Sequence, residues 1–104
     1  MQEDNKKKPG QINIELSEEM ADGIYSNLAI ITHSNSEFIL DFIKIMPGVP
    51  KAKVKSRIIL TPQHAKRLNK ALVENLRKFE SMHGKIDEGQ ETMPMNFGTP
   101  TAQA

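Results

Sequence analysis

The sequence predicts an α+β fold, a four-stranded antiparallel meander followed by one long amphipathic C-terminal helix. Three observations predict it. Four segments between residues 11 and 60 have the alternating or continuous apolar character of β-strands. Turn-forming residues separate these segments, and the short connections favour antiparallel pairing. Residues 61–84 then carry apolar side chains at helical spacing, which predicts a helix packed against one face of the sheet.

The chain of 104 residues is long enough for one domain. Residues 1–10 and 87–104 are polar or rich in Gly, Pro, Thr and Gln, so we expect a disordered N-terminal arm and a disordered C-terminal tail. Residues 11–86 form the predicted domain, and a core of that size contributes only ~3–5 kcal/mol. The sequence has no cysteine for a disulfide or a Cys-ligated metal. Oligomerisation is therefore the expected source of additional stability.

The first half of the predicted meander contains two strands. Residues 11–16 place Ile12, Ile14 and Leu16 on one face, which indicates a half-buried strand. A loop or a single helical turn follows it, because a serine can cap this segment and a glycine can end it. Residues 24–33 predict a longer strand, and the Ser-Asn-Ser sequence after it predicts a hairpin turn.

The second half of the meander contains one apolar and one alternating strand. Residues 37–46 are apolar on both faces, which favours a central strand or one beneath an oligomer interface. Asp41 interrupts this segment, and a buried carboxylate needs a partner, so we expect it to pair with Arg57 on the next strand. Residues 51–60 alternate, with one apolar face made by Ala52, Val54, Ile58 and Leu60 and one basic face.

The predicted helix has a clear beginning and end. Thr61 is a suitable N-cap, Pro62 suits the first helical position, and Gly84 suits the C-terminal cap. An apolar stripe runs between them, and it predicts core residues: Ala65, Leu68, Leu72, Leu76 and Phe79.

The net charge of +1 hides a strongly basic middle of the chain. Residues 51–78 contain nine Lys or Arg and a single Glu, whereas the segments on either side carry a net negative charge. The candidate partner-binding residues come from the last strand and the helix: Lys53, Lys55, Arg57, Lys66, Arg67 and Lys70. They form either one positive patch at the strand–helix corner or two solvated faces that point in different directions. The acidic flanking segments favour an acidic protein partner over nucleic acid.

A strand that is apolar on both faces in so small a domain predicts a homodimer or a larger homo-oligomer. The candidate interface residues are one aromatic side chain at the start of the second strand and three isoleucines of the third: Tyr25, Ile39, Ile43 and Ile45. Ordinary packing within the sheet is the alternative for Tyr25.

The sequence predicts no enzyme. His33, His64 and His83 are spaced unlike any metal motif, and Asp41 has no second acid or nucleophile beside it in the sequence. We therefore expect no catalytic residue, no cofactor and no bound metal.

No stretch reaches the ~18 apolar residues of a membrane helix, and no apolar run follows the N-terminal lysines as in a signal peptide. The expected location is the cytoplasm.

Several short strings in combination resemble a bacterial family of about this length, a domain of unknown function common in Bacteroidota. The strings span most of the predicted domain and lie at residues 25–27, 37–42, 47–48, 57–68, 79–80 and 84–86. Members of that family are often encoded beside the large subunits of RNA polymerase. The resemblance implies an association with transcription and no established activity.

A looser resemblance is to the export chaperone SecB, which shares a four-stranded antiparallel sheet followed by a helix and the character of residues 37–42. This chain lacks SecB's longer second helix and its aromatic-rich groove, and its aromatic content is only 5%. The sequence thus predicts a small non-enzymatic protein-binding module, an accessory factor of the transcription machinery. A SecB-like holdase is the alternative.

Overall fold

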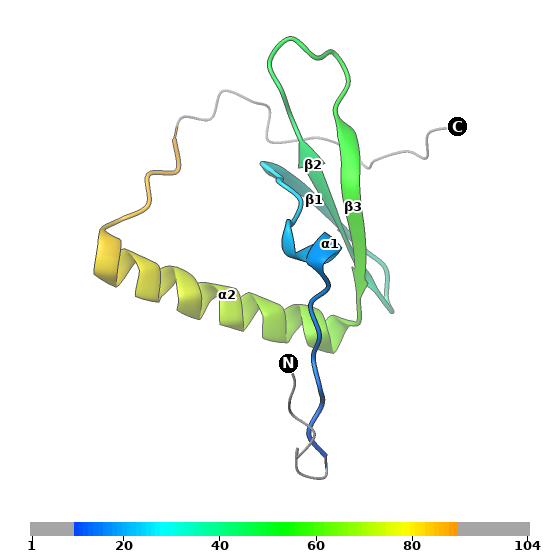
Figure 1. Ribbon diagram of the computed structural model, residues 1–104, viewed down its shortest axis with the longest axis vertical. Coiled ribbons are helices and arrows are strands. Elements are labelled where there is room, and N and C mark those ends of the chain that lie inside the picture. Colours follow the sequence, from blue (N-terminus) through cyan, green and yellow to red (C-terminus); the bar gives the residue numbers. More distant parts are fainter. Residues whose placement is uncertain (1–9, 90–104) are drawn as a thin grey trace.

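The computed structural model describes residues 10–89 of the chain. In chain order its elements are α1 (Glu18–Ala21), β1 (Leu28–His33), β2 (Phe38–Lys44), β3 (Lys53–Leu60) and α2 (Pro62–His83). The α+β class and the long C-terminal helix are confirmed, and the sheet has three antiparallel strands in the order β1-β2-β3 (Figure 1). The predicted disordered arm and tail lie almost entirely outside the described residues.

The β1–β2 hairpin forms where the Ser-Asn-Ser sequence predicts it. The Ser34 hydroxyl accepts hydrogen bonds from the backbone N–H groups of Ser36 and Glu37, both at 3.2 Å. At the other end of β1, the Asn27 side chain extends the pairing beyond the strand. It accepts a bond from the Ile45 N–H at 2.8 Å and donates one to the Ile45 carbonyl at 3.0 Å. At the start of β1, hydrogen bonds from the Asn27 side chain to the backbone of Ile45 therefore continue the pairing with the chain after β2.

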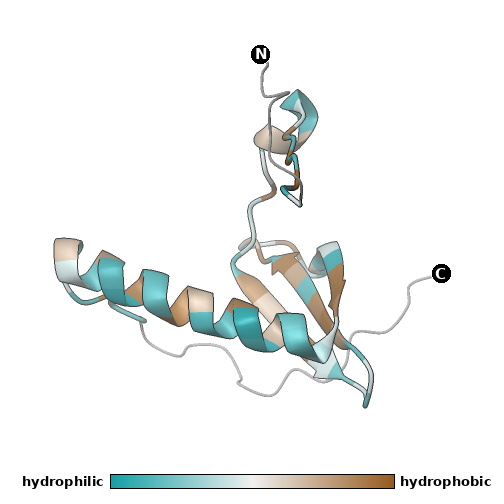
Figure 2. Ribbon diagram, turned by 90° about the horizontal axis from the view of Figure 1, so that it is seen from below, coloured by the Kyte–Doolittle hydropathy of each residue, from teal (hydrophilic) through white to brown (hydrophobic). Residues whose placement is uncertain are grey.

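A fourth strand is not present in the described part of the chain. Residues 11–16 are not part of the sheet, and Ile12, Ile14 and Leu16 are 81%, 86% and 72% exposed. Together with α1, this segment extends away from the rest of the molecule (Figure 2). The prediction from alternation fails within the single chain because alternation indicates a face to be buried but does not determine whether the segment reaches a sheet edge.

An irregularity in β3 changes which of its side chains share a face. Ser56 pairs with Phe42 and Val54 pairs with Ile43, so Lys55 is an extra residue without a counterpart on β2. Such a bulge reverses the alternation on one side of it. Lys53 and Arg57 consequently lie on opposite faces of the sheet, because their partners Lys44 and Asp41 do. The prediction of one basic face and one apolar face along this strand is wrong for that reason.

The ends of α2 follow the predicted capping. The Thr61 hydroxyl accepts a hydrogen bond from the His64 N–H at 3.1 Å, and Pro62 is the first helical residue. Gly84 has φ of 91°, a conformation that residues with a side chain rarely adopt, and its N–H donates to the Glu80 carbonyl at 2.9 Å. The Glu80 carboxylate also accepts a bond from the Ile86 N–H at 3.0 Å, which attaches the following segment to the helix.

The helix does not lie against the sheet. It begins directly after β3 and projects away from it (Figures 1 and 2). Leu68, Leu72 and Leu76 are 40%, 54% and 43% exposed, so the prediction that they are core residues is wrong for the single protomer. A periodic apolar stripe indicates a face that needs cover but not which surface covers it.

The core of the protomer is correspondingly small. Among the described residues, the buried apolar side chains are Ile43 and Leu60, at 5% and 7% exposure. An independently stable domain of this size needs a larger core. Most of the large apolar side chains of the described residues therefore remain partly or largely exposed in the single chain.

Candidate functional site

The charged side chain that is fully buried among the described residues, Asp41, lies on the central strand of the sheet. Asp41 stands between Ile30 of β1 and Arg57 of β3 in the strand register. Its carboxylate accepts two hydrogen bonds from the Arg57 guanidinium, at 2.6 Å from Nε and 2.9 Å from Nη2. The Asp41 side chain is fully buried, whereas half of the Arg57 side chain is exposed. The predicted pairing of these two residues is confirmed.

The electrostatics of this pair keep both groups charged. The hydrogen bonds from Arg57 hold the pKa of Asp41 below its usual value of 3.8, and they outweigh the burial that raises it. The same bonds raise the pKa of Arg57. Because both carboxylate oxygens are engaged and no nucleophile pairs with them, the arrangement suits a structural role. A slip of one residue between β2 and β3 would leave the buried carboxylate unpaired, so the pair fixes the strand register.

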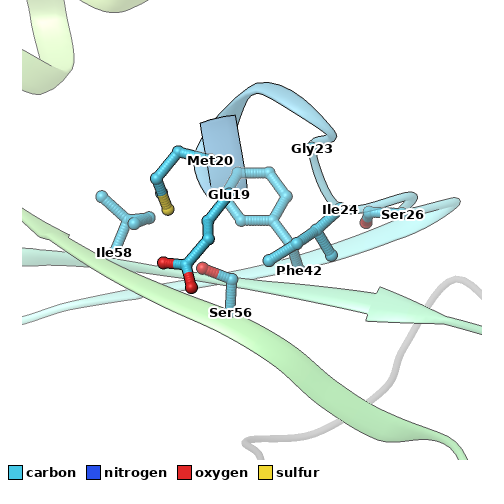
Figure 3. Close-up of a pocket in the computed structure, with 8 residues that line it drawn as sticks. All are labelled: Glu19, Met20, Gly23, Ile24, Ser26, Phe42, Ser56 and Ile58. Atoms are coloured by element: carbon cyan, nitrogen blue, oxygen red, sulfur yellow. The ribbon is translucent and has the colours of Figure 1, made fainter. Parts of the chain in front are cut away.

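A shallow cavity of about 350 Å³ lies between α1 and the face of the sheet opposite to that of Asp41 and Arg57 (Figure 3). Its walls are mainly apolar, and they come from the α1 segment, β2 and β3: Glu19, Met20, Gly23, Ile24, Ser26, Phe42, Ser56 and Ile58. The Glu19 carboxylate and the Ser56 hydroxyl point toward each other across it (Figure 3). One carboxylate and one hydroxyl without a base or an oxyanion donor do not make a catalytic set. The cavity is the open space between this face of the sheet and α1, a four-residue helix that stands off the sheet (Figure 2).

The sequence gives no direct signal for this cavity. The single helical turn is predicted, and Ser17 caps it by accepting a bond from the Met20 N–H at 3.2 Å. That α1 lies over Phe42 and Ile58 depends on long-range packing, which local periodicity does not report. In the sequence, the one indication that α1 faces the sheet is its amphipathic character, because Met20 and Ile24 lie close to two glutamates.

The six predicted partner-binding cations do not form one cluster. Arg57 is occupied by Asp41, and Lys53 lies on the opposite sheet face. At ~3.3 Å per residue along the strand, Lys53 and Lys55 are on the order of 15–25 Å from the corner where α2 begins. Three exposed cations remain together, in the early turns of α2: Lys66, Arg67 and Lys70.

The four predicted interface residues have different surroundings. Ile43 is buried inside the protomer, and Ile39 and Ile45 are half-buried. Tyr25 is 67% exposed, and the Lys44 ammonium lies 5.7 Å from the centre of its ring. Tyr25 is thus the member of this set whose side chain is most available to another molecule.

The largest exposed apolar element is α2. Its stripe comprises Leu68, Leu72, Leu76 and Phe79, which are each 40–54% exposed, and it ends at Met82, which is 76% exposed. Cations flank the stripe along most of the helix. A helix with an apolar stripe beside a basic face is the arrangement used by helices that insert into grooves on other proteins.

Residues 10–89 hold no group of three or more His, Asp or Glu side chains that could bind a metal ion. Neither helix in this range combines the length and the hydrophobicity needed to cross a membrane.

Fold and surface together define a small α+β protein that exposes apolar faces and, among its described residues, pairs the fully buried Asp41 carboxylate with the half-exposed Arg57. The chain belongs to the family described as "Protein of unknown function (DUF3467)", whose match covers residues 1–88. This membership confirms the resemblance to a small domain-of-unknown-function family. No curated protein and no solved structure matches the chain.

Proposed function

We propose that this protein is a non-enzymatic, cytoplasmic protein-binding module that forms a homodimer and attaches to a larger protein through α2. The observation that carries the proposal is the uncovered stripe of α2 in a protomer with only two buried apolar side chains among its described residues. Covering Leu68, Leu72, Leu76 and Phe79 fully would contribute ~3–6 kcal/mol per helix, if about half of each side chain remains to be buried.

The charges beside the stripe favour a foreign partner over a second α2. The helix contains five Lys or Arg and two Glu, so two copies of it would repel each other along their length. A groove with an apolar floor and an acidic rim is complementary to it. The large subunits of RNA polymerase are the candidate partner, and this choice rests on the sequence resemblance rather than on the geometry.

A SecB-like holdase is the second candidate. The observation that favours it is the number of exposed apolar side chains outside α2, on the sheet and between α1 and β1, among them Ile31, Ile59 and Tyr25. Several separate apolar surfaces suit extended, unfolded clients better than one folded partner.

The test is affinity purification of the full chain from its native host, at two salt concentrations. The first variant is the triple substitution Lys66→Glu, Arg67→Glu and Lys70→Glu. Its control, Lys53→Glu with Lys55→Glu, changes two exposed cations of β3 that lie away from α2. We expect RNA polymerase subunits with the native chain and the control. We expect a loss of at least tenfold with the triple variant and weaker recovery at high salt.

Two results would overturn the proposal. Equal recovery by the folded triple variant would show that the cations of α2 do not contact the partner. A heterogeneous set of unfolded precursors, released by denatured competitor protein, would favour the holdase instead.

A further inference from the structure

The two edges of the sheet differ in how they are protected against pairing with other strands. An exposed edge can pair with another chain, and proteins usually prevent this with lysines, bulges or very short strands. The β3 edge has such protection, because Lys53 and Lys55 lie along it and Lys55 is an extra residue that interrupts its regular pairing. The β1 edge has neither feature: the strand Leu28–His33 contains no Lys, Arg, Asp or Glu and pairs with β2 without interruption. The edge of β1 is therefore the one suited to accept another strand.

The hairpin determines which backbone groups of β1 point outward. The Ser34 N–H donates to the Glu37 carbonyl at 2.9 Å, so these two residues form a hydrogen-bonded pair. Hydrogen-bonded and non-hydrogen-bonded pairs alternate along an antiparallel ladder. In the register of β1 with β2, the non-hydrogen-bonded positions of β1 are therefore Ala29, Ile31 and His33. The N–H and carbonyl groups of these residues point away from β2, and no strand of residues 10–89 pairs with that side of β1.

The outward groups of β1 are complementary to a second copy of themselves. Edge strands related by a two-fold axis run antiparallel, and residues that face each other share one side of the sheet, so one residue must face its own copy. With the axis at Ile31, Ala29 faces His33, and every outward N–H and carbonyl group of the strand has a partner. Since β1 contains no Lys, Arg, Asp or Glu, this pairing opposes no like charges. The Ile31 side chain, 60% exposed in the protomer, then contacts its own copy.

We propose that β1 pairs with β1 of a second copy about a two-fold axis at Ile31, which joins two three-stranded sheets into one continuous antiparallel sheet. A second copy is the partner because the edge is complementary to itself and because the small core of one protomer, Ile43 and Leu60, needs additional burial. The strand β3, which leads directly into α2, forms both outer edges of the joined sheet, so the pairing itself does not involve α2. The inference rests on the homodimer of the proposed function and specifies its interface.

A chain without cysteine allows the pairing to be tested with one cysteine per copy, which can form a disulfide only between copies. Opposite Cα atoms of a hydrogen-bonded pair are ~5.5 Å apart, within the range for a disulfide. The full-length Ile31→Cys variant should therefore form a covalent dimer under mild oxidation at low micromolar concentration. The matched control is Ile59→Cys, because Ile59 is similarly exposed, at 55%, on the other edge strand. Its yield of covalent dimer should be lower by about tenfold or more.

Differently tagged full-length copies test the register. A copy with Ala29→Cys should cross-link to a copy with His33→Cys. Ala29→Cys alone should not cross-link, because its two copies are offset by ~13 Å along the strands. Equal yields from Ile31→Cys and Ile59→Cys would overturn the proposal, as would the absence of a covalent dimer from Ile31→Cys. Preferential cross-linking of Ala29→Cys to Ile31→Cys would place the axis at Ile30 and contradict the proposed register.

Charges introduced at the axis provide a second test that needs no disulfide. Ile31→Lys places two lysines opposite each other, so it should raise the dimer dissociation constant by about tenfold or more, while Ile31→Val leaves it unchanged. An equimolar mixture of Ile31→Lys and Ile31→Glu should recover dimers that contain both chains, which a misfolded variant would not do. Light scattering then separates two failures. A native dimer that Ile31→Lys does not weaken contradicts β1 pairing alone, whereas a native chain that is monomeric contradicts the homodimer of the proposed function as well.

Discussion

Replacing Leu72 by alanine separates a core role of the α2 stripe from a role in partner binding. Leu72 lies in the middle of the helix and is 54% exposed. If the free protein leaves the stripe uncovered, Leu72→Ala should change the stability of that protein only slightly. If a partner covers the stripe, the same substitution should weaken the complex.

The structure gives the expected magnitudes. Complete burial of a leucine side chain contributes ~1.5–3 kcal/mol, and the protomer covers less than half of Leu72. The free energy of unfolding of the free protein should therefore fall by ~1 kcal/mol or less. A leucine buried in a core costs ~2–5 kcal/mol on replacement by alanine. The part of Leu72 left for a partner is worth ~1–1.5 kcal/mol, which weakens affinity roughly tenfold.

The assay compares Leu72→Ala with Leu60→Ala in urea denaturation of the free protein and in binding to the purified partner. Leu60 is only 7% exposed at the end of β3 and serves as the core control. We expect a loss of ~2–5 kcal/mol of stability for Leu60→Ala and of ~1 kcal/mol or less for Leu72→Ala. Only the α2 variant should weaken partner binding while the protein remains fully folded.

One result would refute this reasoning. A loss of stability for Leu72→Ala as large as that for Leu60→Ala, without partner present, would mean that the stripe is already buried in the free protein. A second copy or the protomer's own sheet would then cover α2, and α2 would not be the surface for a foreign partner.

Two further predictions concern the ion pair and the helix cap. The lowered pKa of Asp41 means that its ion pair with Arg57 stabilises the folded state fully above the ordinary pKa of 3.8 and that this contribution is lost as the pH falls through the lower pKa of the folded state. Asp41→Asn should therefore lower the urea midpoint at pH 7 and flatten its decline below about pH 4; an unchanged decline would assign acid unfolding to other groups. Thr61→Ala should lower the free energy of unfolding by ~1 kcal/mol in thermal melts followed by circular dichroism, while Thr61→Ser retains the cap, and equal melts for all three chains would contradict the capping role.

The parts of the fold that local chemistry determines could be predicted from the sequence. The boundaries of α2 follow from Thr61, Pro62 and Gly84, whose capping roles depend only on near neighbours. The hairpin at Ser34 follows in the same way. The pairing of Asp41 with Arg57 was predictable because a buried carboxylate leaves few alternatives.

The parts that depend on distant contacts could not be predicted. Alternation in residues 11–16 predicts a strand but does not reveal that this segment lies outside its own sheet. The extra residue Lys55 has no sequence signal, and it divides the predicted basic face of β3 between the two sides of the sheet. The apolar stripe of α2 predicts core residues for the same reason. Helical periodicity indicates that a face is suited to burial, but it does not distinguish burial by the same chain from burial by another molecule.

The projection of α2 away from the sheet has a consequence for the amount of this protein in a cell. A copy without a partner displays an uncovered apolar helix, and quality-control proteases and chaperones recognise such surfaces. In the proposed function, binding of a partner to α2 shifts the population toward protected molecules by mass action. Free copies should consequently be short-lived, and the steady-state level of the protein should follow the level of whatever covers α2 rather than its own rate of synthesis.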